Sequence, residues 1–172
     1  MTTRYTTLDT LDPAVGPLLL VGEDSTTARG GLALASVSMT GQKNAAVIRP
    51  GWVEDEAAFA EVTAQLRAYL AGTATGFDLE FTPGGTDFQR RVWAALEQLP
   101  YGSTTSYGAL AERAGIPRAA VRALGAAIGA NPLLVVRPCH RVLGADGSLT
   151  GYAGGLERKR LLLALEAAHT TA

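Results

Sequence analysis

The sequence predicts an α+β protein, in which a small N-terminal α/β domain with a short antiparallel sheet precedes a mostly helical C-terminal domain containing a helix-turn-helix. Short apolar runs separated by glycine-containing turns occur only in the first half, whereas helical spacing dominates after residue 86. Thr82-Pro83-Gly84-Gly85 interrupts both patterns. We therefore expect domains at residues 1–82 and 83–172.

The first half contains the candidate strands. Residues 18–21 and 31–37 have the composition of short strands, and residues 44–48 are a candidate third. Apolar residues recur at helical spacing over 54–70, and Gly72 is expected to close that helix. Residues 77–81 alternate strictly, which predicts a strand or an extended linker.

The second half contains a series of short helices. Thr86 or Asp87 can cap the first helix, whose apolar residues lie three or four apart on one face. Helices at 107–114 and about 118–129, joined by a glycine-containing turn, have the outline of a helix-turn-helix. Residues 133–136 are apolar and predicted to be buried. A last helix over 157–167 is expected to pack its leucines inward and to present residues 158–160 outward.

Composition excludes several classes of protein. Of 172 residues, 47% are hydrophobic and 18% charged, as in ordinary globular proteins. No secretory signal opens the chain and no apolar run could cross a bilayer, so we expect a cytoplasmic protein. The one cysteine excludes an internal disulfide. With only His140 and His169 as further soft ligands, we expect no metal and no cofactor.

Charge is distributed unevenly between the halves. Residues 1–85 hold five Lys and Arg against ten Asp and Glu, a net charge of −5, whereas residues 86–172 hold ten against six, a net charge of +4. The second half is therefore the candidate for an anionic partner. The alternative is a neutral protein with an uneven surface charge.

Cys139 is the candidate nucleophile. It follows the buried segment in the run Pro138-Cys139-His140-Arg141. A free thiol has a pKa of roughly 8.5, so it needs a nearby base or cation to react well at neutral pH. The adjacent histidine and arginine are candidates for that role. The alternative is that Cys139 is a small hydrophobic core residue.

Several motifs resemble one known family. Pro-Cys-His-Arg-Val, the Asn131-Pro132 turn before it and Gly-Tyr-Ala-Gly-Gly after it resemble the active-site signature of the O6-alkylguanine-DNA alkyltransferases. The resemblance extends from about Thr86 to Glu166 and includes Thr-Asp-Phe-Gln-Arg-Arg-Val-Trp and Pro-Tyr-Gly-Ser-Thr-Thr-Ser-Tyr. The first half is similar to the family's N-terminal, ribonuclease H-like scaffold domain only in size and α/β character.

The resemblance implies a role for each residue around the cysteine. Cys139, poised as a thiolate, would be the alkyl acceptor, and His140 would draw its proton through a water. Glu166 would orient this histidine, and Arg141 would tie the active-site loop down. A carboxylate–imidazole–thiol chain is chemically reasonable, because the carboxylate stabilises the imidazolium that forms with the thiolate.

The resemblance also implies a pocket for the base. Tyr107 would donate its hydroxyl to N3 of the guanine, and the backbone N–H of Ala153 would face O6 as negative charge grows there. Some relatives have serine where this chain has Ala153, so we expect an altered substrate range or rate. The carbonyls of Cys139 and Val142 would accept from the exocyclic amine, and Tyr152 would wall the pocket. The full predicted pocket set is Asn131, Pro138, Val142, Tyr152, Ala153 and Gly154.

A buried thiol reaches an alkylated base only if the base leaves the helical stack. The resemblance implies that Arg122 fills the gap and that the second helix of the motif docks in the minor groove. Small residues in that helix suit a close backbone approach, although they equally suit packing between helices. The predicted DNA-contacting set is Arg122, Thr104, Ser106, Ala123, Ala126 and Ala127.

Together these observations predict direct-reversal repair of double-stranded DNA. We expect a monomer that transfers the alkyl group of O6-methylguanine, and less readily of O4-methylthymine, irreversibly to Cys139 in one turnover. One alternative is a non-catalytic lesion binder or regulator, although damage sensors that resemble the family lack the cysteine. A cysteine hydrolase is a second alternative, which leaves the helix-turn-helix unexplained.

Overall fold

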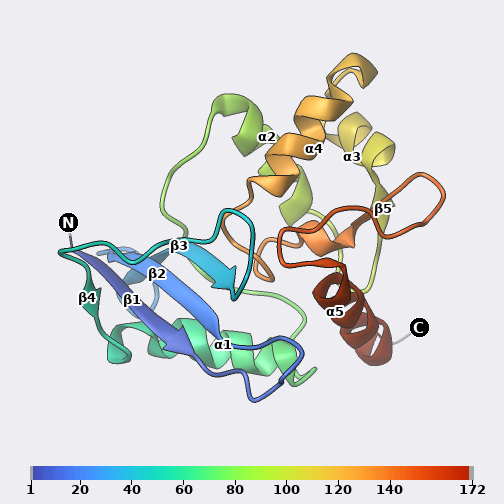
Figure 1. Ribbon diagram of the computed structural model, residues 1–172. Helices are drawn as coiled ribbons and strands as arrows, with labels where there is room; N and C mark the ends of the chain where they lie inside the picture. The colour runs from blue at the N-terminus through green and yellow to red at the C-terminus, as the bar shows by residue number, and fades with distance from the viewer. Residues whose placement is uncertain (1, 171–172) are drawn as a thin grey trace. The chain divides into compact units, whose positions relative to one another are not determined.

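The computed structural model describes residues 2–170 (Figure 1). The chain forms two compact units, each considered by itself below. The first contains the residues up to Pro83 together with Pro132–Val136, and the second contains Gly84–Asn131 and the residues from Arg137 onward. The apolar segment before Cys139 therefore belongs to the core of the first unit, although the cysteine itself belongs to the second.

The first unit is built on a four-stranded sheet. Its strands are β1 (Thr3–Leu8), β2 (Leu18–Asp24), β3 (Leu32–Met39) and β4 (Val53–Glu54). The order is β3-β2-β1-β4, with β2 antiparallel to both long neighbours and β4 parallel to β1. This arrangement confirms the predicted N-terminal sheet.

One helix covers a face of that sheet (Figure 1). The one-turn 3-10 helix η1 (Ala57–Phe59) leads into α1 (Ala60–Leu70). The helix buries Val62, Leu66 and Tyr69 at the spacing that predicted it. Alternate residues of β2, Leu18 and Leu20, are fully buried in the same core. The helix begins later than the sequence pattern indicated, because η1 occupies the first predicted turn.

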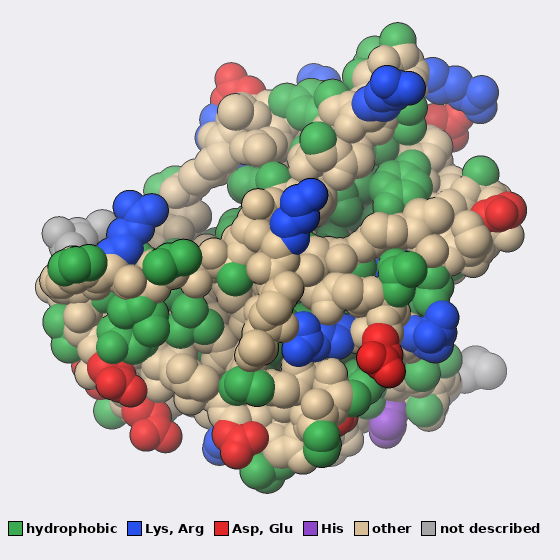
Figure 2. All heavy atoms as spheres, viewed as in Figure 1, with side chains coloured by type: hydrophobic (Ala, Val, Ile, Leu, Met, Phe, Trp, Pro, Cys, Tyr) green, Lys and Arg blue, Asp and Glu red, His purple; other side chains and the backbone are tan. Residues whose placement is uncertain are grey.

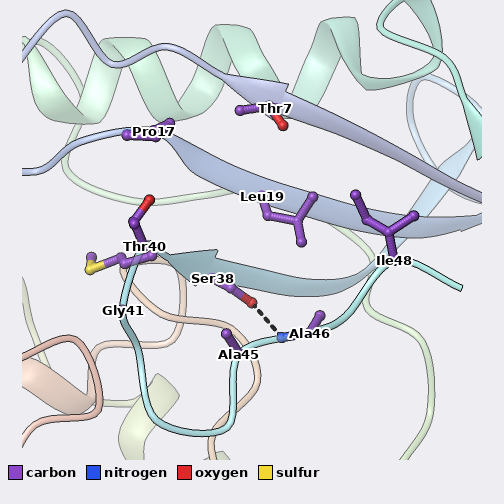
Figure 3. A pocket seen from close by; sticks show the side chains of 10 residues that line it. Thr7, Pro17, Leu19, Ser38, Thr40, Gly41, Ala45, Ala46 and Ile48 are labelled. Atoms are coloured by element: carbon purple, nitrogen blue, oxygen red, sulfur yellow. Dashed lines mark hydrogen bonds between the residues drawn. The ribbon is translucent and has the colours of Figure 1, made fainter.

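The structure differs from the expected elements of this unit at two places, and it agrees with the expectation for residues 77–81. The strand β1 was not predicted, because Thr3–Leu8 alternates weakly. Residues 44–48 are a loop instead of a strand, and Asn44 in it has a left-handed φ of 67°. Figure 3 shows the loop held against β3, where Ser38 Oγ accepts a hydrogen bond from the Ala46 amide at 3.2 Å. Residues 77–81 are extended, with only Phe81 bridging to β3.

The second unit contains three helices that pack on one another. These are α2 (Asp87–Glu97), α3 (Tyr107–Ala114) and α4 (Val121–Gly129), the last preceded by the 3-10 turn η2 (Arg118–Ala120). Thr86, one of the two predicted caps, forms a capping box with Gln89 at the start of α2. Ser106 caps α3, and Gly115 ends it in the left-handed conformation. The predicted bounds of α3 match the structure.

The remaining elements surround Cys139. The 3-10 turn η3 (Cys139–Arg141) runs directly into β6 (Val142–Leu143), which pairs in parallel with β5 (Thr105–Ser106). The last helix, α5 (Leu156–His169), packs against η3. Within residues 2–170 the structure has no helix both long and apolar enough to cross a membrane.

The prediction that residues 158–160 all face outward is wrong at its central residue. Lys159 is only 1% exposed, whereas Arg160 is exposed and Arg158 is half-buried. The ammonium group is buried because three backbone carbonyls accept its hydrogen bonds: Val142 at 2.6 Å, Thr150 at 2.9 Å and Gly151 at 3.1 Å. Lys159 thus ties α5 to β6 and to the loop that follows it.

Candidate active site

A short strand pairing brings the predicted catalytic residues together. β5 ends one residue before Tyr107, and β6 begins one residue after Arg141. Their register, Thr105 to Val142 and Ser106 to Leu143, sets the start of α3 beside the cysteine turn. Because α5 packs on the same turn, it adds Glu166 to the group. Residues far apart in the sequence therefore meet at η3.

Cys139 lies at the start of this turn and is only 4% exposed. Its amide donates to the Arg137 carbonyl at 2.7 Å, and the Arg141 amide donates to the Pro138 carbonyl at 3.1 Å. These bonds fix the backbone on both sides of the sulfur. The thiol is free, since no second cysteine exists.

His140 and Glu166 form a buried pair. The Nε2 atom of His140 lies 2.7 Å from Glu166 Oε2, and the two residues are 0% and 1% exposed. A carboxylate can only accept, so Nε2 carries the hydrogen, and Nδ1 is the basic nitrogen of the neutral ring. The pairing inferred from the resemblance is therefore present, although the sequence separates its members by 26 residues.

Arg141 binds the same carboxylate. Its Nε and Nη2 atoms donate to Glu166 at 2.8 and 2.9 Å, and its Nη1 donates to the Leu99 carbonyl at 2.6 Å. Glu166 Oε1 also accepts from the Gly102 amide at 3.0 Å. A two-pronged guanidinium–carboxylate pair is among the stronger charged hydrogen-bond arrangements. It ties the cysteine turn to α5, as the resemblance implied.

The protonation of Cys139 in the free protein differs from the expectation. Burial raises the pKa of Cys139 to about 11, against the opposing effects of an Asn131 side-chain hydrogen bond and the charges of Lys159 and Arg137. The resting group at neutral pH is therefore a thiol, and the expectation of a poised thiolate is wrong for this state. The cause is desolvation, which disfavours the charged form of the sulfur.

Burial has the opposite effect on the pKa of His140. Burial is the largest influence on the pKa of His140 and, together with the charges of Arg141 and Lys159, lowers it against the opposing effect of Glu166. The imidazole is consequently neutral at neutral pH and able to take a proton. Both groups are therefore neutral before the reaction. A thiolate then forms only as its proton passes to a base and the sulfur reacts.

Tyr107 lies at the edge of the site. Its hydroxyl donates to the Thr150 carbonyl at 3.2 Å. Lys159 donates to that same carbonyl at 2.9 Å. The Tyr107 hydroxyl thus has an acceptor in the loop after β6. Sequence analysis did not find this role of Lys159, because it counted the residue with its exposed neighbours.

The predicted pocket residues divide by exposure. Asn131, Pro138, Val142 and Gly154 are buried, and Tyr152 and Ala153 are half-buried in the loop that leads to α5. The Val142 carbonyl accepts from Lys159 at 2.6 Å, so one of its two lone pairs is in use. Sequence analysis also missed Arg137, which contacts Asn131 and carries one of the charges that act on Cys139.

The predicted DNA-contacting residues lie on the outside of the same unit, with one exception. Thr104, Arg122, Ala123 and Ala126 are exposed, and Ser106 is half-buried at the cap of α3. Ala127 is only 3% exposed, and its carbonyl accepts from Trp93 Nε1 at 2.8 Å. Ala127 therefore packs α4 against α2, the second of the two roles considered for the small residues of this helix.

Positive charge gathers near the exposed residues. Arg113, Arg118 and Arg122 are all exposed, and residues 113–145 contain no Asp or Glu. Figure 2 shows blue side chains over the part of the molecule where η2 and the start of α4 lie. The net charge of +4 computed for residues 86–172 thus has a surface on which it concentrates. Such a surface attracts the phosphates of a nucleic acid.

Metal ligands do not cluster in residues 2–170: no group of three or more His, Cys, Asp and Glu side chains there could hold an ion. The chemistry available at η3 is that of a thiol, an imidazole and a carboxylate. This set suits a nucleophilic attack by sulfur.

Comparison with known proteins gives consistent matches. Residues 87–168 match the family model of the 6-O-methylguanine DNA methyltransferase DNA binding domain. A methylated-DNA–protein-cysteine methyltransferase of Mycolicibacterium paratuberculosis is 50% identical over 163 residues, which cover 95% of this chain and 93% of that protein. One from Methanosarcina acetivorans is 44% identical over 152 residues, covering 88% and 92%. The crystal structure of Mycobacterium tuberculosis OGT in complex with DNA superposes with a TM-score of 0.83 at 45% identity, covering 100% of this chain and 96% of that one.

Proposed function

The chain belongs to the methylated-DNA–protein-cysteine methyltransferase family, and we propose that Cys139 is the residue that accepts the alkyl group in its repair reaction. The reaction is direct reversal: the alkyl group of O6-alkylguanine in DNA passes to a protein cysteine. The observation that carries the proposal is that the one cysteine of the chain adjoins the buried His140–Glu166 pair. No other residue offers this sulfur chemistry.

The nucleophile forms during the reaction. Cys139 rests as a thiol, so its proton must leave as the sulfur attacks the alkyl carbon. His140 takes that proton at Nδ1 through a bridging water, and Glu166 stabilises the resulting imidazolium at 2.7 Å. Arg141 holds the carboxylate in place for this step. Proton transfer by a positioned base contributes typically about 10²- to 10⁴-fold to a rate.

The bond changes balance around the alkyl carbon. A sulfur–carbon bond forms, the carbon–O6 bond breaks, and its electron pair stays on the guanine. Tyr107 donates its hydroxyl to N3 and the Ala153 amide faces O6, so donors meet the base where negative charge grows. The guanine anion takes a proton, and the net result moves the thiol proton to the base. The thioether is stable, and no second cysteine exists to regenerate the thiol, so each protein molecule acts once.

Extrusion of the damaged nucleotide precedes the chemistry, because the sulfur of Cys139, a residue only 4% exposed, cannot reach a stacked base. Arg122 fills the space that the base leaves, while Thr104 and the α3 cap at Ser106 contact phosphates. Ala123 and Ala126 let α4 approach the minor groove closely. The small exposed side chains provide few donors to read base edges, which suits a search that is independent of sequence.

Several further properties belong to the same proposal. The protein acts as a monomer in the cytoplasm, without a cofactor, and accepts O4-methylthymine less readily than O6-methylguanine. Residues 1–82 serve as a scaffold for the unit that carries the chemistry. Non-catalytic lesion binding is disfavoured, since the acceptor cysteine and its base are both present.

Stoichiometry tests the proposal. A duplex containing one O6-methylguanine is titrated with the protein, and the restored guanine is quantified by chromatography of the digested DNA. We expect restoration to end at one guanine per protein molecule, with none restored by Cys139→Ala. Restoration of many guanines per molecule, or undiminished activity of Cys139→Ala, would show that another group carries the reaction.

A further inference from the structure

Arg137 is an unusually placed cation. It lies two residues before Cys139 and is only 8% exposed. Burying a guanidinium is costly unless partners replace its water. Its Nη2 lies 3.3 Å from Glu97 Oε1, and its guanidinium stacks 4.8 Å from the centre of the Trp93 ring. Both of these partners belong to α2.

The guanidinium also reaches the side chain of Asn131. Arg137 Nη1 donates to Asn131 Oδ1 at 3.4 Å, while Asn131 Nδ2 donates to the Arg137 carbonyl at 3.1 Å. Rotating the amide by half a turn would place its NH2 group against the Arg137 guanidinium, so that two donors face each other. It would also place its oxygen against the Arg137 carbonyl, so that two acceptors face each other. Arg137 therefore fixes which way round the amide lies.

This orientation has a consequence for the sulfur. An amide NH2 group has two hydrogens, and Asn131 uses one of them on the Arg137 carbonyl. Burial raises the pKa of Cys139, and a hydrogen bond with the Asn131 side chain acts against that rise. Donation to the sulfur favours the thiolate over the thiol, as does a positive charge nearby. Arg137 provides the charge itself and holds the donor in place.

Lys159 and Arg137 act from different surroundings. Three carbonyls accept the three hydrogens of the Lys159 ammonium. Arg137 instead contacts the amide of Asn131. Burial lowers the pKa of Arg137, and the charges of Glu97 and Cys139 oppose that effect, while the charge of Arg137 in turn lowers the pKa of Cys139. The coupling is reciprocal, as linkage requires.

We propose that Arg137 is a positioning residue for alkyl transfer: its guanidinium orients the Asn131 amide toward Cys139 and keeps positive charge beside the sulfur as the thiolate forms. The proposal rests on the proposed role of Cys139 as acceptor. It differs from a purely structural role for Arg137, in which the ion pair with Glu97 would only join α2 to the cysteine segment.

Two substitutions distinguish these roles, because they remove opposite charges from one ion pair. Arg137→Met removes the positive charge and keeps the length of the side chain. Glu97→Gln removes the negative charge at a carboxylate that is 36% exposed. If charge and orientation matter, Arg137→Met raises the pKa of the thiol and Glu97→Gln leaves it unchanged or lowers it. If the ion pair only joins α2 to the cysteine segment, Arg137→Met and Glu97→Gln both slow the reaction.

The measurement is the rate at which iodoacetamide alkylates Cys139 between pH 6 and pH 10, followed by mass spectrometry. It needs no DNA, and thermal unfolding checks that each variant is folded. We expect Arg137→Met to react roughly three- to tenfold more slowly at neutral pH, because a higher pKa of the thiol leaves less thiolate to react. Glu97→Gln should match or exceed the unaltered protein, and Arg137→Lys should recover part of the lost rate.

Equal rates for Arg137→Met and the unaltered protein would overturn the proposal, as would a matching loss in Glu97→Gln. Should Arg137→Met fail to fold, Glu97→Gln and Arg137→Lys still decide: slowing of both below a third of the normal rate contradicts it. Alkyl transfer from methylated duplex is measured in parallel with the unaltered protein. If the unaltered protein transfers no alkyl group, the role of Cys139 as acceptor is refuted. If it does transfer the group but the alkylation rates of Arg137→Met are unchanged across the pH range, only the role of Arg137 is refuted.

Discussion

Replacing Glu166 by glutamine removes the charge on which the buried side of the site depends. Its carboxylate, 1% exposed, accepts two hydrogen bonds from Arg141, one from His140 and one from the Gly102 amide. The amide of glutamine keeps one accepting oxygen and presents two donors in place of the other. Arg141 is then a buried cation without its counter-charge. Breaking a buried pair in this way costs about 3–5 kcal/mol of the free energy of unfolding.

The chemical effect follows from the histidine tautomer. If the glutamine NH2 group faces His140, Nε2 becomes an acceptor and the hydrogen moves to Nδ1. Nδ1 then presents a donor where the proposed reaction needs a base. We expect alkyl transfer from methylated duplex to slow by about 10²- to 10⁴-fold, the usual contribution of a positioned base.

The assay is a single-turnover time course of guanine restoration, with urea unfolding of the same preparation. Glu157→Gln, an exposed change in the first turn of the same helix, is the matched control and should alter neither quantity. The reasoning would be refuted by a folded Glu166→Gln protein that transfers the alkyl group at the normal rate.

The other predictions concern the thiol, the buried lysine and the exposed arginine. Because the folded pKa of Cys139 is raised from 9.0 to about 11, the thiol's contribution to the free energy of unfolding is full below pH 9 and is lost as pH rises through 11. Relative to Cys139→Ala, the unaltered protein should therefore lose up to about 3 kcal/mol of that free energy over this range, measured by urea unfolding. The same pH dependence in both proteins would contradict the shift. Lys159→Met removes the donor to three carbonyls, of which that of Thr150 keeps the Tyr107 hydroxyl, and should cost about 2–4 kcal/mol in the same measurement, whereas Arg160→Met on the surface should change little. Arg122→Ala should slow transfer from duplex DNA about 10- to 100-fold, because nothing then offsets a base-extrusion cost of a few kcal/mol, while leaving reaction with a free O6-benzylguanine base unchanged; equal slowing of both substrates would argue against a role in extrusion.

Local signals in the sequence predict some elements closely and others poorly. The bounds of α3 follow from chemistry at its two ends, since Ser106 caps it and Gly115 ends it. In contrast, β1 gives little signal because four of its six residues are threonine or arginine, and only its pairing with β2 settles its conformation. The apolar 44–48 segment gives a false signal, since Asn44 turns the backbone away from an extended path.

The site shows the same limit. The motif around Cys139 and the resemblance that it carries were sufficient to pair His140 with Glu166. The sequence could not show that Lys159 is buried, because a charged triplet ordinarily faces solvent and only the three carbonyls make its burial tolerable. It also could not show the resting state of the sulfur, which depends on how completely the folded chain excludes water from it.

The most direct test of the account asks which atom holds the alkyl group after repair. The protein is incubated with an equimolar duplex containing O6-methylguanine labelled in its methyl group, digested with a protease, and mapped by tandem mass spectrometry. The account predicts one labelled methyl group, on the sulfur of Cys139 and on no other residue. Label on a different side chain, or restored guanine with an unlabelled Cys139, would contradict it.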